Sequence, residues 1–307
     1  MLYSFRNRLA RARYDRGVRG ILETPPLQIV PAPLTFCSMV SERDLLMYLV
    51  AIKSLYPRIG EGRIRVIDDG TLTPRGKETL RLHLGSPTIV PIASIDTGLC
   101  PLGGTWERLL HILDLTEDSY VIQVDSDLLA RAAVSEVVEC YRTNRSFTLG
   151  THMGQRFTSL DEAAAAARAS GGTHVQMVAE QALDRLLDAA QKRYVRGCSG
   201  FAGFARGSSP RHAAEEFSVA IQNIIGDRWN EWGSEQVTSN YIVSNSEQPI
   251  VLPISKYRNH TRDTEIEEIS LLHFLGTDRF YGGRYLRASQ SLISEVRRKN
   301  VNVNQQQ

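Results

Sequence analysis

Two aspartates separated by one residue are the first candidate for chemistry in this sequence. Asp125 and Asp127 directly follow the apolar run 119–124, which has the length and composition of a buried strand. Two carboxylates at such a position stay ionised at low cost only when a cation neutralises them. Hard oxygen ligands favour Mn²⁺ or Mg²⁺, which substrate phosphates typically complete. The structural alternative is that both aspartates cap the next helix.

The elements that must position this pair alternate between strand and helix. Strands are predicted over 35–40, 63–67, 88–92 and 119–124, and helices over 42–56, 72–84 and 106–113. Pro57 is expected to end the first helix. This alternation predicts an α/β fold with a mostly parallel sheet covered by helices on both faces. Ligands of such folds gather beyond the carboxyl ends of the strands, where both acidic pairs (68–69 and 125–127) lie.

The second half of the chain alternates less regularly. Helices are predicted over 161–168, 174–192, 210–226 and 234–245, and a glycine-rich stretch covers 197–204. No linker separates two domains. His152 follows a further predicted strand, and a place beside the acceptor is one interpretation of it.

Composition narrows the class of protein. Of 307 residues, 42% are hydrophobic and 23% are charged, which is ordinary for a soluble globular chain and excludes a fibrous or disordered one. No apolar run reaches the length of a membrane span. The four cysteines show no Cys-x-x-Cys spacing, so they indicate neither a zinc site nor a disulfide framework. We expect a reducing, cytoplasmic setting.

The net charge of +2 is unevenly distributed. Residues 1–20 hold six arginines and one aspartate, a balance of +5, so the rest of the chain sums to −3. A basic patch of this size does not indicate a nucleic-acid-binding protein. We expect a solvated and partly disordered arm; the alternative is a helix that contacts anionic headgroups at the inner face of a membrane.

Several motifs in the first half resemble those of a known class. Tyr120-Val-Ile-Gln-Val-Asp-Ser-Asp127 resembles the metal-binding strand of nucleotide-sugar-dependent glycosyltransferases with the GT-A fold, which has a Rossmann-like sheet. Gly104-Thr-Trp-Glu-Arg108 resembles the helix start that precedes this strand, which implies that Arg108 faces the donor. The strands ending at Val40 and Asp68 resemble those that receive the nucleotide base, which implies that these two residues bind it.

A motif near the C-terminus resembles family 8 retaining glycosyltransferases. His273-Phe-Leu-Gly276-Thr-Asp-Arg279 is similar to the His-x-x-Gly-x-x-Lys signature of that family. The resemblance implies that His273 joins Asp125 and Asp127 as a metal ligand, and that Gly276 and Arg279 hold the diphosphate. Arginine replaces lysine here; its planar fork suits phosphate oxygens but makes different contacts.

A third motif resembles the family 8 segment that contacts donor sugar and acceptor. Glu235-Gln-Val-Thr-Ser-Asn240 is similar to Asp-Gln-Asp-x-x-Asn, which implies such roles for Glu235, Gln236 and Asn240. Val237 departs from the motif, because a second acid is expected there. Glu235 also suits the first turn of a helix, where the macrodipole favours an acid.

The glycine-rich stretch carries a looser similarity. Cys198-Ser-Gly-Phe201 is similar to an Asn-x-Gly-Val segment that lines the donor pocket. This similarity implies that Ser199 and Gly200 bind the donor.

The resemblance implies a glycosyltransferase of the hexosyltransferase type. With Mn²⁺ (or Mg²⁺), it would move a sugar from a nucleoside-diphosphate sugar, by resemblance a UDP-sugar, to a hydroxyl of a glycan, a lipid-linked or a small-molecule acceptor. The domains are then a basic arm (1–33), a catalytic domain (34–300) and a polar, frayed tail (301–307). Within the catalytic domain, 34–130 is the nucleotide-binding half and 131–300 the donor-sugar and acceptor half.

Two other functions compete with glycosyl transfer. A nucleotidylyltransferase, which forms a nucleotide sugar, usually carries a glycine-rich basic loop after its first strand, and residues 40–44 contain no glycine. A non-catalytic GT-A domain that binds glycans or partner proteins is expected to lack metal ligands, and all three candidates are present.

Overall fold

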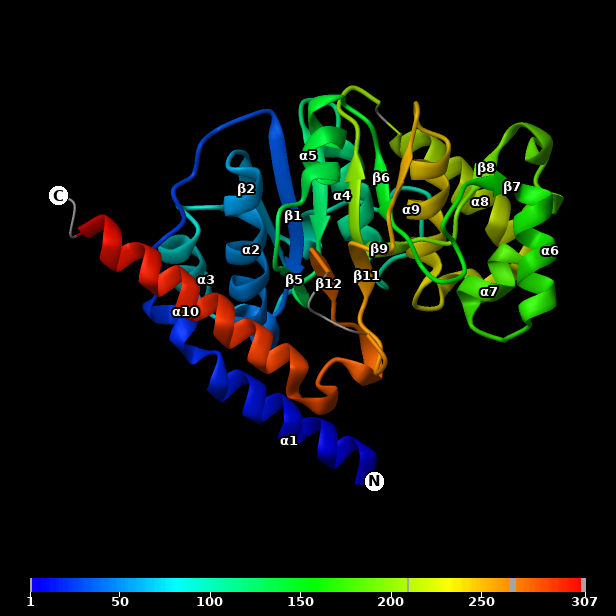
Figure 1. The fold of residues 1–307 in the computed structure, drawn as a ribbon. Coiled ribbons are helices and arrows are strands. Elements are labelled where there is room, and N and C mark those ends of the chain that lie inside the picture. The colour runs from blue at the N-terminus through cyan, green and yellow to red at the C-terminus, as the bar shows by residue number, and fades with distance from the viewer. Residues whose placement is uncertain (1, 209, 265–268, 305–307) are drawn as a thin grey trace.

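The computed structural model of the chain describes residues 2–208, 210–264 and 269–304. Its central sheet contains seven strands: β1 (Leu34–Val40), β2 (Arg63–Asp68), β3 (Thr88–Pro91), β4 (Tyr120–Val124), β6 (Phe147–Leu149), β9 (Cys198–Phe204) and β10 (Ile250–Leu252). They lie in the order β10-β6-β9-β4-β1-β2-β3 (Figure 1). Only β9 runs antiparallel to its neighbours in this sheet, β4 and β6. The predicted α/β class with a mostly parallel sheet is confirmed.

Two sets of helices bury the two faces of the sheet. The first hydrophobic cluster joins the sheet to α2 (Leu45–Ile59), α3 (Pro74–His83), α5 (Ser135–Arg142) and α10 (Arg284–Asn304). The second joins it to α4 (Trp106–Leu115), α6 (Leu160–Ser170), α7 (Val175–Glu180), α8 (Arg211–Ile225) and α9 (Ser234–Ser244). Along β1, Phe36 belongs to the first cluster and Cys37 to the second, because successive side chains of a strand point to opposite faces.

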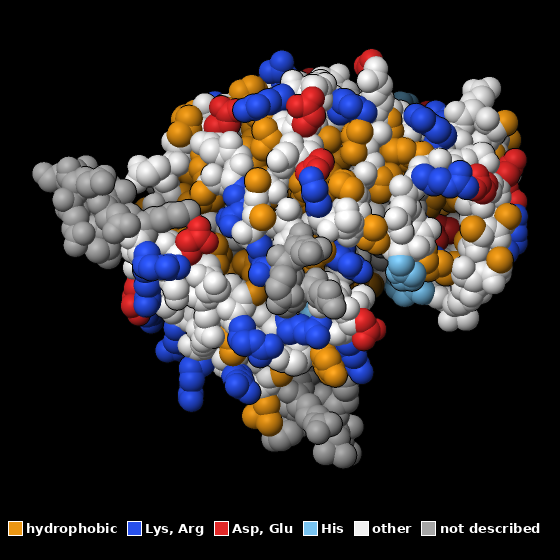
Figure 2. Space-filling view, viewed as in Figure 1, with side chains coloured by type: hydrophobic (Ala, Val, Ile, Leu, Met, Phe, Trp, Pro, Cys, Tyr) orange, Lys and Arg blue, Asp and Glu red, His pale blue; other side chains and the backbone are white. Residues whose placement is uncertain are grey.

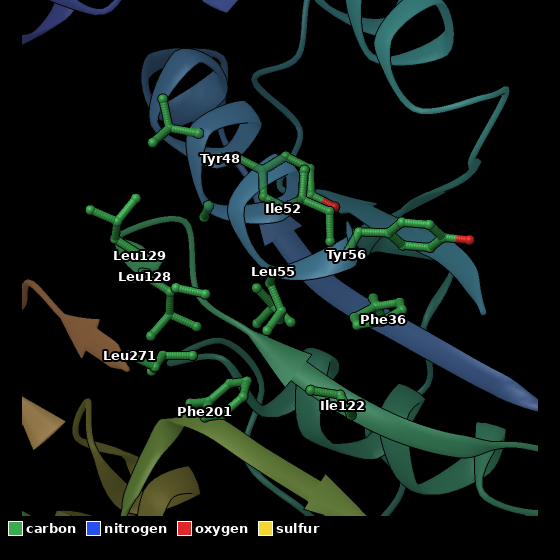
Figure 3. Close-up of a cluster of buried hydrophobic side chains, with 14 of the residues drawn as sticks. Phe36, Tyr48, Ile52, Leu55, Tyr56, Ile122, Leu128, Leu129, Phe201 and Leu271 are labelled. Carbon is green, nitrogen blue, oxygen red and sulfur yellow. The ribbon is translucent and has the colours of Figure 1, made fainter. Parts of the chain in front are cut away.

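The core between α2 and the sheet holds β4 in place. In Figure 3, Ile52 and Leu55 of α2 lie over Phe36 and Ile122 of the sheet, and all four side chains are buried. Burial of one such side chain stabilises a fold by about 1.5–3 kcal/mol. The carboxyl end of β4, from which Asp125 and Asp127 follow, is therefore firmly positioned.

A second, three-stranded sheet brings the C-terminal part of the chain to the end of β4. It consists of β5 (Leu128–Ala130), β11 (Tyr257–Asn259) and β12 (Leu271–His273). In the antiparallel pair of β5 and β12, His273 lies opposite Leu128, and in the parallel pair of β11 and β12 it lies opposite Asn259. Because β5 begins directly after Asp127, this register places His273 beside the acidic pair.

The N-terminal arm differs from the expectation of a solvated, partly disordered segment. Residues Leu2–Gly17 form α1, which lies beside α10 (Figure 1). Tyr14, Val18 and Ile21 are buried in the first cluster, and Arg11 pairs with Asp44. The expectation is wrong for this part because the covering helix comes from the other end of the chain, which no local pattern reveals. No described helix has the length and apolarity needed to cross a membrane.

Two helix predictions also need correction. Helix α2 continues through Pro57 to Ile59, and Gly60, whose φ is 92°, caps it. Proline is tolerated there because it removes one hydrogen bond close to the end of the helix. The helix predicted over 174–192 is wrong: it is α7 followed by two short 3-10 turns. Leu183 and Leu186 of this segment are buried in the second cluster, so tertiary packing outweighs local helix propensity.

The remaining elements are short. The predicted frayed tail, 301–307, continues α10 as far as Asn304, and 305–307 lie outside the described residues. A two-stranded sheet pairs β7 (Thr158–Ser159) with β8 (Arg193–Tyr194). The 3-10 helices are η1 (Arg19–Glu23), η2 (Glu42–Asp44), η3 (Ile92–Ser94), η4 (Leu183–Arg185), η5 (Ala189–Gln191), η6 (Gly226–Asn230), η7 (Gly276–Asp278) and η8 (Tyr281–Gly283).

A buried lysine and histidine make the stability of this fold depend on pH. The ammonium of Lys53 in α2 donates to Oγ1 of Thr24 (2.8 Å) and to the carbonyl of Pro25 (2.7 Å), and it lies 3.0 Å from Nδ1 of His83. Burial and the neighbouring ammonium together lower the pKa of His83 from 6.5 to about 4.

We expect the free energy of unfolding to decrease as the pH falls from about 6.5 to about 4. In this window the unfolded chain protonates His83 while the folded chain keeps it neutral, so the unfolded state binds more protons. Urea unfolding at pH 7 and pH 5 measures the decrease. The variant His83→Asn, which keeps an acceptor for Lys53, should show a smaller decrease; an equal decrease in both proteins would contradict the assignment.

Candidate active site

Three predicted metal ligands converge at the carboxyl end of β4. Nε2 of His273 lies 3.0 Å from Oδ1 of Asp127 and 3.6 Å from Oδ2 of Asp125. Each residue offers one ligand atom, and these atoms all lie within 4.8 Å of one another. Two carboxylate oxygens and one imidazole nitrogen form a donor set that suits a divalent cation such as Mn²⁺ or Mg²⁺. The three residues can therefore hold one metal ion.

Backbone hydrogen bonds fix the positions of these ligands. The N–H of Asp125 donates to the carbonyl of Gly200 in β9 (2.9 Å), and the N–H of Phe274 donates to the carbonyl of Asp127 (2.9 Å). Gly200 also leaves room for the imidazole, since a Cβ at this position would lie 2.2 Å from Cε1 of His273. Glycine is thus required by the close approach of the ring.

The far nitrogen of the imidazole has partners that sequence reasoning did not find. Nδ1 of His273 lies 3.1 Å from Oδ1 of Asn259 and 3.4 Å from Sγ of Cys198. Without a metal, Nε2 donates to Oδ1 of Asp127 (3.0 Å); with a metal bound at Nε2 instead, a proton on Nδ1 donated to Asn259 would leave the lone pair of Nε2 for the ion. Asn259 lies in no recognisable motif; only the pairing of β11 with β12 identifies it.

One arginine is shared between two acids at the carboxyl end of β4. The guanidinium of Arg108 pairs with Asp125 through Nη1 and lies 3.4 Å from Oε1 of Glu235 through Nη2. Glu235 is 2% exposed and also accepts from Oγ1 of Thr105 (3.0 Å). Burial raises the pKa of both Asp125 and Glu235, and the charge of Arg108 opposes that rise. The predicted Arg108 and Glu235 therefore belong to the same site as the three ligands.

A second arginine neutralises the other aspartate. Nη2 of Arg279 lies 2.7 Å from Oδ2 of Asp127, and its Nε donates to the carbonyl of Phe274 (2.8 Å). Burial alone would raise the pKa of Asp127, but the hydrogen bond and charge of His273 and the charge of Arg279 hold it below the ordinary value. Asp127 is thus flanked by basic side chains, which the sequence analysis of two repelling carboxylates did not anticipate.

A polar network continues from this site into α9 and α7. Oγ of Ser199 lies 3.4 Å from both Oε2 of Glu235 and Oε1 of Gln236. Nε2 of Gln236 donates to Oε1 of Gln176 (2.9 Å), a residue of α7 that sequence reasoning missed. Ser199, Glu235 and Gln236 therefore form one polar wall next to Asp125.

One of the other predicted binding residues, Gly276, adjoins this cluster, because its carbonyl accepts a hydrogen bond from the N–H of Arg279 (3.4 Å). Asn240 is fully buried and donates to the carbonyl of Gly197 (3.1 Å), so it supports the backbone that enters β9. Asp68 pairs with Lys77 (2.7 Å) and accepts hydrogen bonds within the turn that follows β2. Val40 is buried at the end of β1, and Gly276 begins η7 with a φ of 63° and open space around it.

Similarity to known proteins is found among solved structures. No protein-family model and no curated protein matches the chain. Among similar solved structures, mouse xyloside xylosyltransferase 1 in its apo form has 14% identity and a TM-score of 0.46, over 80% of this chain and 97% of that one. The galactosyltransferase LgtC with donor and acceptor sugar analogues has 14% identity and a TM-score of 0.47, over 84% and 95%. The apo glycosyltransferase GlyE of Streptococcus pneumoniae TIGR4 has 14% and 0.49, over 87% and 63%.

We expect Gly200→Ala to weaken binding of Mn²⁺ by about tenfold or more, because the added methyl group displaces the ring of His273. Electron paramagnetic resonance of free Mn²⁺ measures the affinity, and circular dichroism checks the fold. His273→Ala provides the control background, in which adding Gly200→Ala should change the affinity no further. Wild-type affinity in the Gly200→Ala protein would show that the ring does not contribute to metal binding.

Proposed function

We propose that this protein is a metal-dependent glycosyltransferase that moves a sugar from a nucleoside-diphosphate sugar to an acceptor hydroxyl. The main support for the proposal is the convergence of Asp125, Asp127 and His273, whose ligand atoms lie within 4.8 Å of one another. Two arginines contact the same two aspartates, so cation and anion sites adjoin. A UDP-sugar is the proposed donor because of the motif resemblance, and Mn²⁺ or Mg²⁺ is the proposed ion.

The charges around the three ligands favour a diphosphate once a cation is present. Burial alone would lower the pKa of His273, but the carboxylate of Asp127 holds it well above its usual value. Without a metal, the protonated ring and the guanidiniums of Arg108 and Arg279 therefore balance the three carboxylates of Asp125, Asp127 and Glu235. A divalent ion that takes the place of the proton on His273 would add two positive charges and remove one, which leaves one positive charge. Such a site attracts the negatively charged end of a nucleotide sugar.

Cleavage at the anomeric carbon gives the sugar oxocarbenium character and leaves negative charge on the diphosphate. A bound cation would supply Lewis-acid stabilisation of that leaving group. Asp125, Asp127 and His273 would hold the ion. The guanidinium of Arg279, whose side chain is 27% exposed, would turn from Asp127 towards phosphate oxygens, which its two-pronged geometry suits. No acid then has to protonate the departing oxygen.

Glu235 is the proposed contact for the transferred sugar or the acceptor. Thr105 and Arg108 fix its carboxylate, and Ser199 and Gln236 extend the same polar wall. In a retaining reaction these groups would position hydroxyls. In an inverting reaction the carboxylate would take the proton of the acceptor hydroxyl, and burial, which raises its pKa, makes it a better base.

The alternative of nucleotidylyl transfer has less support. A phosphate-cradling loop would follow the first strand, but here the chain turns through η2. The N–H of Asp44 donates to Oγ of Ser41 (3.1 Å), and the carboxylate of Asp44 pairs with Arg11 (2.8 Å). The polar groups of this turn are therefore paired with one another and with the N-terminal helix, rather than left to bind a phosphate.

A basic surface along α1 bears on where the protein acts in the cell. Arg8, Arg13, Arg16 and Arg19 are exposed on or next to α1, and Figure 2 shows Lys and Arg side chains gathered along the lower edge, where α1 and α10 lie. We propose that this basic surface contacts anionic headgroups of a membrane. The four cysteines are free and buried, which fits a reducing, cytoplasmic compartment.

Release of UDP from a panel of UDP-sugars in the presence of Mn²⁺ tests the proposed function. Wild-type protein should hydrolyse at least one donor slowly, and a chelator should abolish the release. Asp127→Asn should reduce the release by about 100-fold or more. It should also lower the metal-free unfolding free energy by about 1–3 kcal/mol, because His273 and Arg279 lose their charged partner.

The exposed Asp118 in the turn before β4 provides a matched control for this variant. Asp118→Asn should retain both donor hydrolysis and stability. Donor hydrolysis that continues unchanged with chelator would contradict metal dependence.

Replacement of Arg279 tests the proposed contact with the diphosphate. Arg279→Ala should raise the barrier to donor hydrolysis by about 2–4 kcal/mol, the scale for losing one preorganised electrostatic contact. Arg279→Lys should recover part of the loss, since it keeps the charge but not the fork. Steady-state release of UDP at saturating Mn²⁺ measures both, with Arg287→Ala, an exposed arginine of α10, as the control. Full turnover in Arg279→Ala would exclude the contact.

A further inference from the structure

A cavity lies between α6 and the segment that follows β6. Its volume is about 290 Å³. Part of its lining comes from three alanines of α6, and its buried end includes a carboxylate, a phenol and a guanidinium: Ala163, Ala166, Ala167, Glu180, Tyr194 and Arg196. His152, which the sequence indicated as a possible neighbour of the acceptor, also lines it.

The carboxylate in this cavity is deeply buried. Glu180 is 2% exposed, accepts a hydrogen bond from the hydroxyl of Tyr194 (2.8 Å) and pairs with Nη1 of Arg196 (3.0 Å). Burying such a pair costs desolvation energy, and apolar side chains of similar volume often stabilise a fold equally well. A buried carboxylate that lines open space and pairs with a half-buried arginine therefore points to a ligand rather than to packing alone.

The charges of the cavity balance. Arg196 pairs with Glu180 at the buried end, and Arg156 pairs with Glu162 among the exposed lining residues. With each arginine matched by a glutamate, the cavity favours neither an anion nor a cation. Strong donors and acceptors side by side suit hydroxyl groups, which both donate and accept.

The shape of the cavity adds to this argument. The small side chains of Ala163, Ala166 and Ala167 leave an apolar surface of the kind that the C–H face of a sugar ring contacts. The volume of the cavity is just below the range of about 300–1,000 Å³ that is typical of ligand pockets, so the cavity suits about one sugar ring.

Two glutamines connect this cavity to the candidate active site. Nε2 of Gln176 donates to Oε1 of Glu180 (3.3 Å), and Oε1 of Gln176 accepts from Gln236 (2.9 Å). Gln236 in turn contacts Ser199 beside Glu235. One side chain, that of Gln176, therefore separates the carboxylate of the cavity from the polar wall formed by Ser199, Glu235 and Gln236.

We propose that this cavity binds a neutral, hydroxylated sugar ring of the acceptor. The acceptor would then be a glycan long enough to reach from Glu180 to the polar wall around Glu235. The inference rests on the proposed function, because an acceptor presupposes glycosyl transfer.

Saturation-transfer difference NMR without donor tests the inference. The probes are the methyl glycosides of glucose, galactose, xylose and N-acetylglucosamine. Wild-type protein should transfer saturation to at least one of these glycosides. Ala166→Trp, which fills the cavity, should abolish that signal, whereas Ala165→Trp, an exposed position on the same helix outside the lining, should retain it. Circular dichroism checks the fold of both variants.

The inference would be overturned if wild-type protein transferred saturation to no glycoside, or if Ala166→Trp transferred as much saturation as wild type. Release of UDP by wild-type protein, measured in parallel, separates this result from the proposed function. Release of UDP without glycoside binding leaves the proposed function intact and removes the acceptor cavity. Glycoside binding without release of UDP from any donor removes the proposed function, and the acceptor assignment with it.

Discussion

The antiparallel pairing of β5 with β12 is the constraint on which the candidate active site depends. It joins the segment directly after Asp127 to a strand 143 residues later by register, with His273 opposite Leu128. Because side chains alternate along a strand, a slip of one residue would turn the imidazole to the other face. Gly200 completes the arrangement, since a larger residue would occupy the space of the ring.

Charge neutralisation is the second requirement of this arrangement. Three buried or half-buried carboxylates can lie together here because Arg108 is shared between Asp125 and Glu235, and Arg279 pairs with Asp127. Unpaired carboxylates at these depths would cost several kcal/mol each. The same arginines are suited to a diphosphate, so the groups that stabilise the folded site also fit the proposed reaction.

A chain of hydrogen bonds connects the polar wall to the cavity beside α6. It leads from Ser199 and Gln236 through Gln176 to Glu180, which lines that cavity. Glu235 contacts Arg108 at one end of this network, and Glu180 lines the charge-balanced cavity at the other end. The proposed transfer needs such a division, because donor and acceptor must approach one sugar carbon from separate sites.

The sequence by itself determined the α/β class and the place of Asp125 and Asp127 at a strand end, because strand length, apolar runs and turns are local signals. Motif resemblance added the grouping of His273 with this pair, which the structure brings together. Only the tertiary structure decided the contact of Asn259 with the imidazole, the sharing of Arg108 with an acid 127 residues later, and the burial of Tyr14 beside Ser289, 275 residues away. These partners meet through strand register and helix packing, which leave no periodic pattern in the chain.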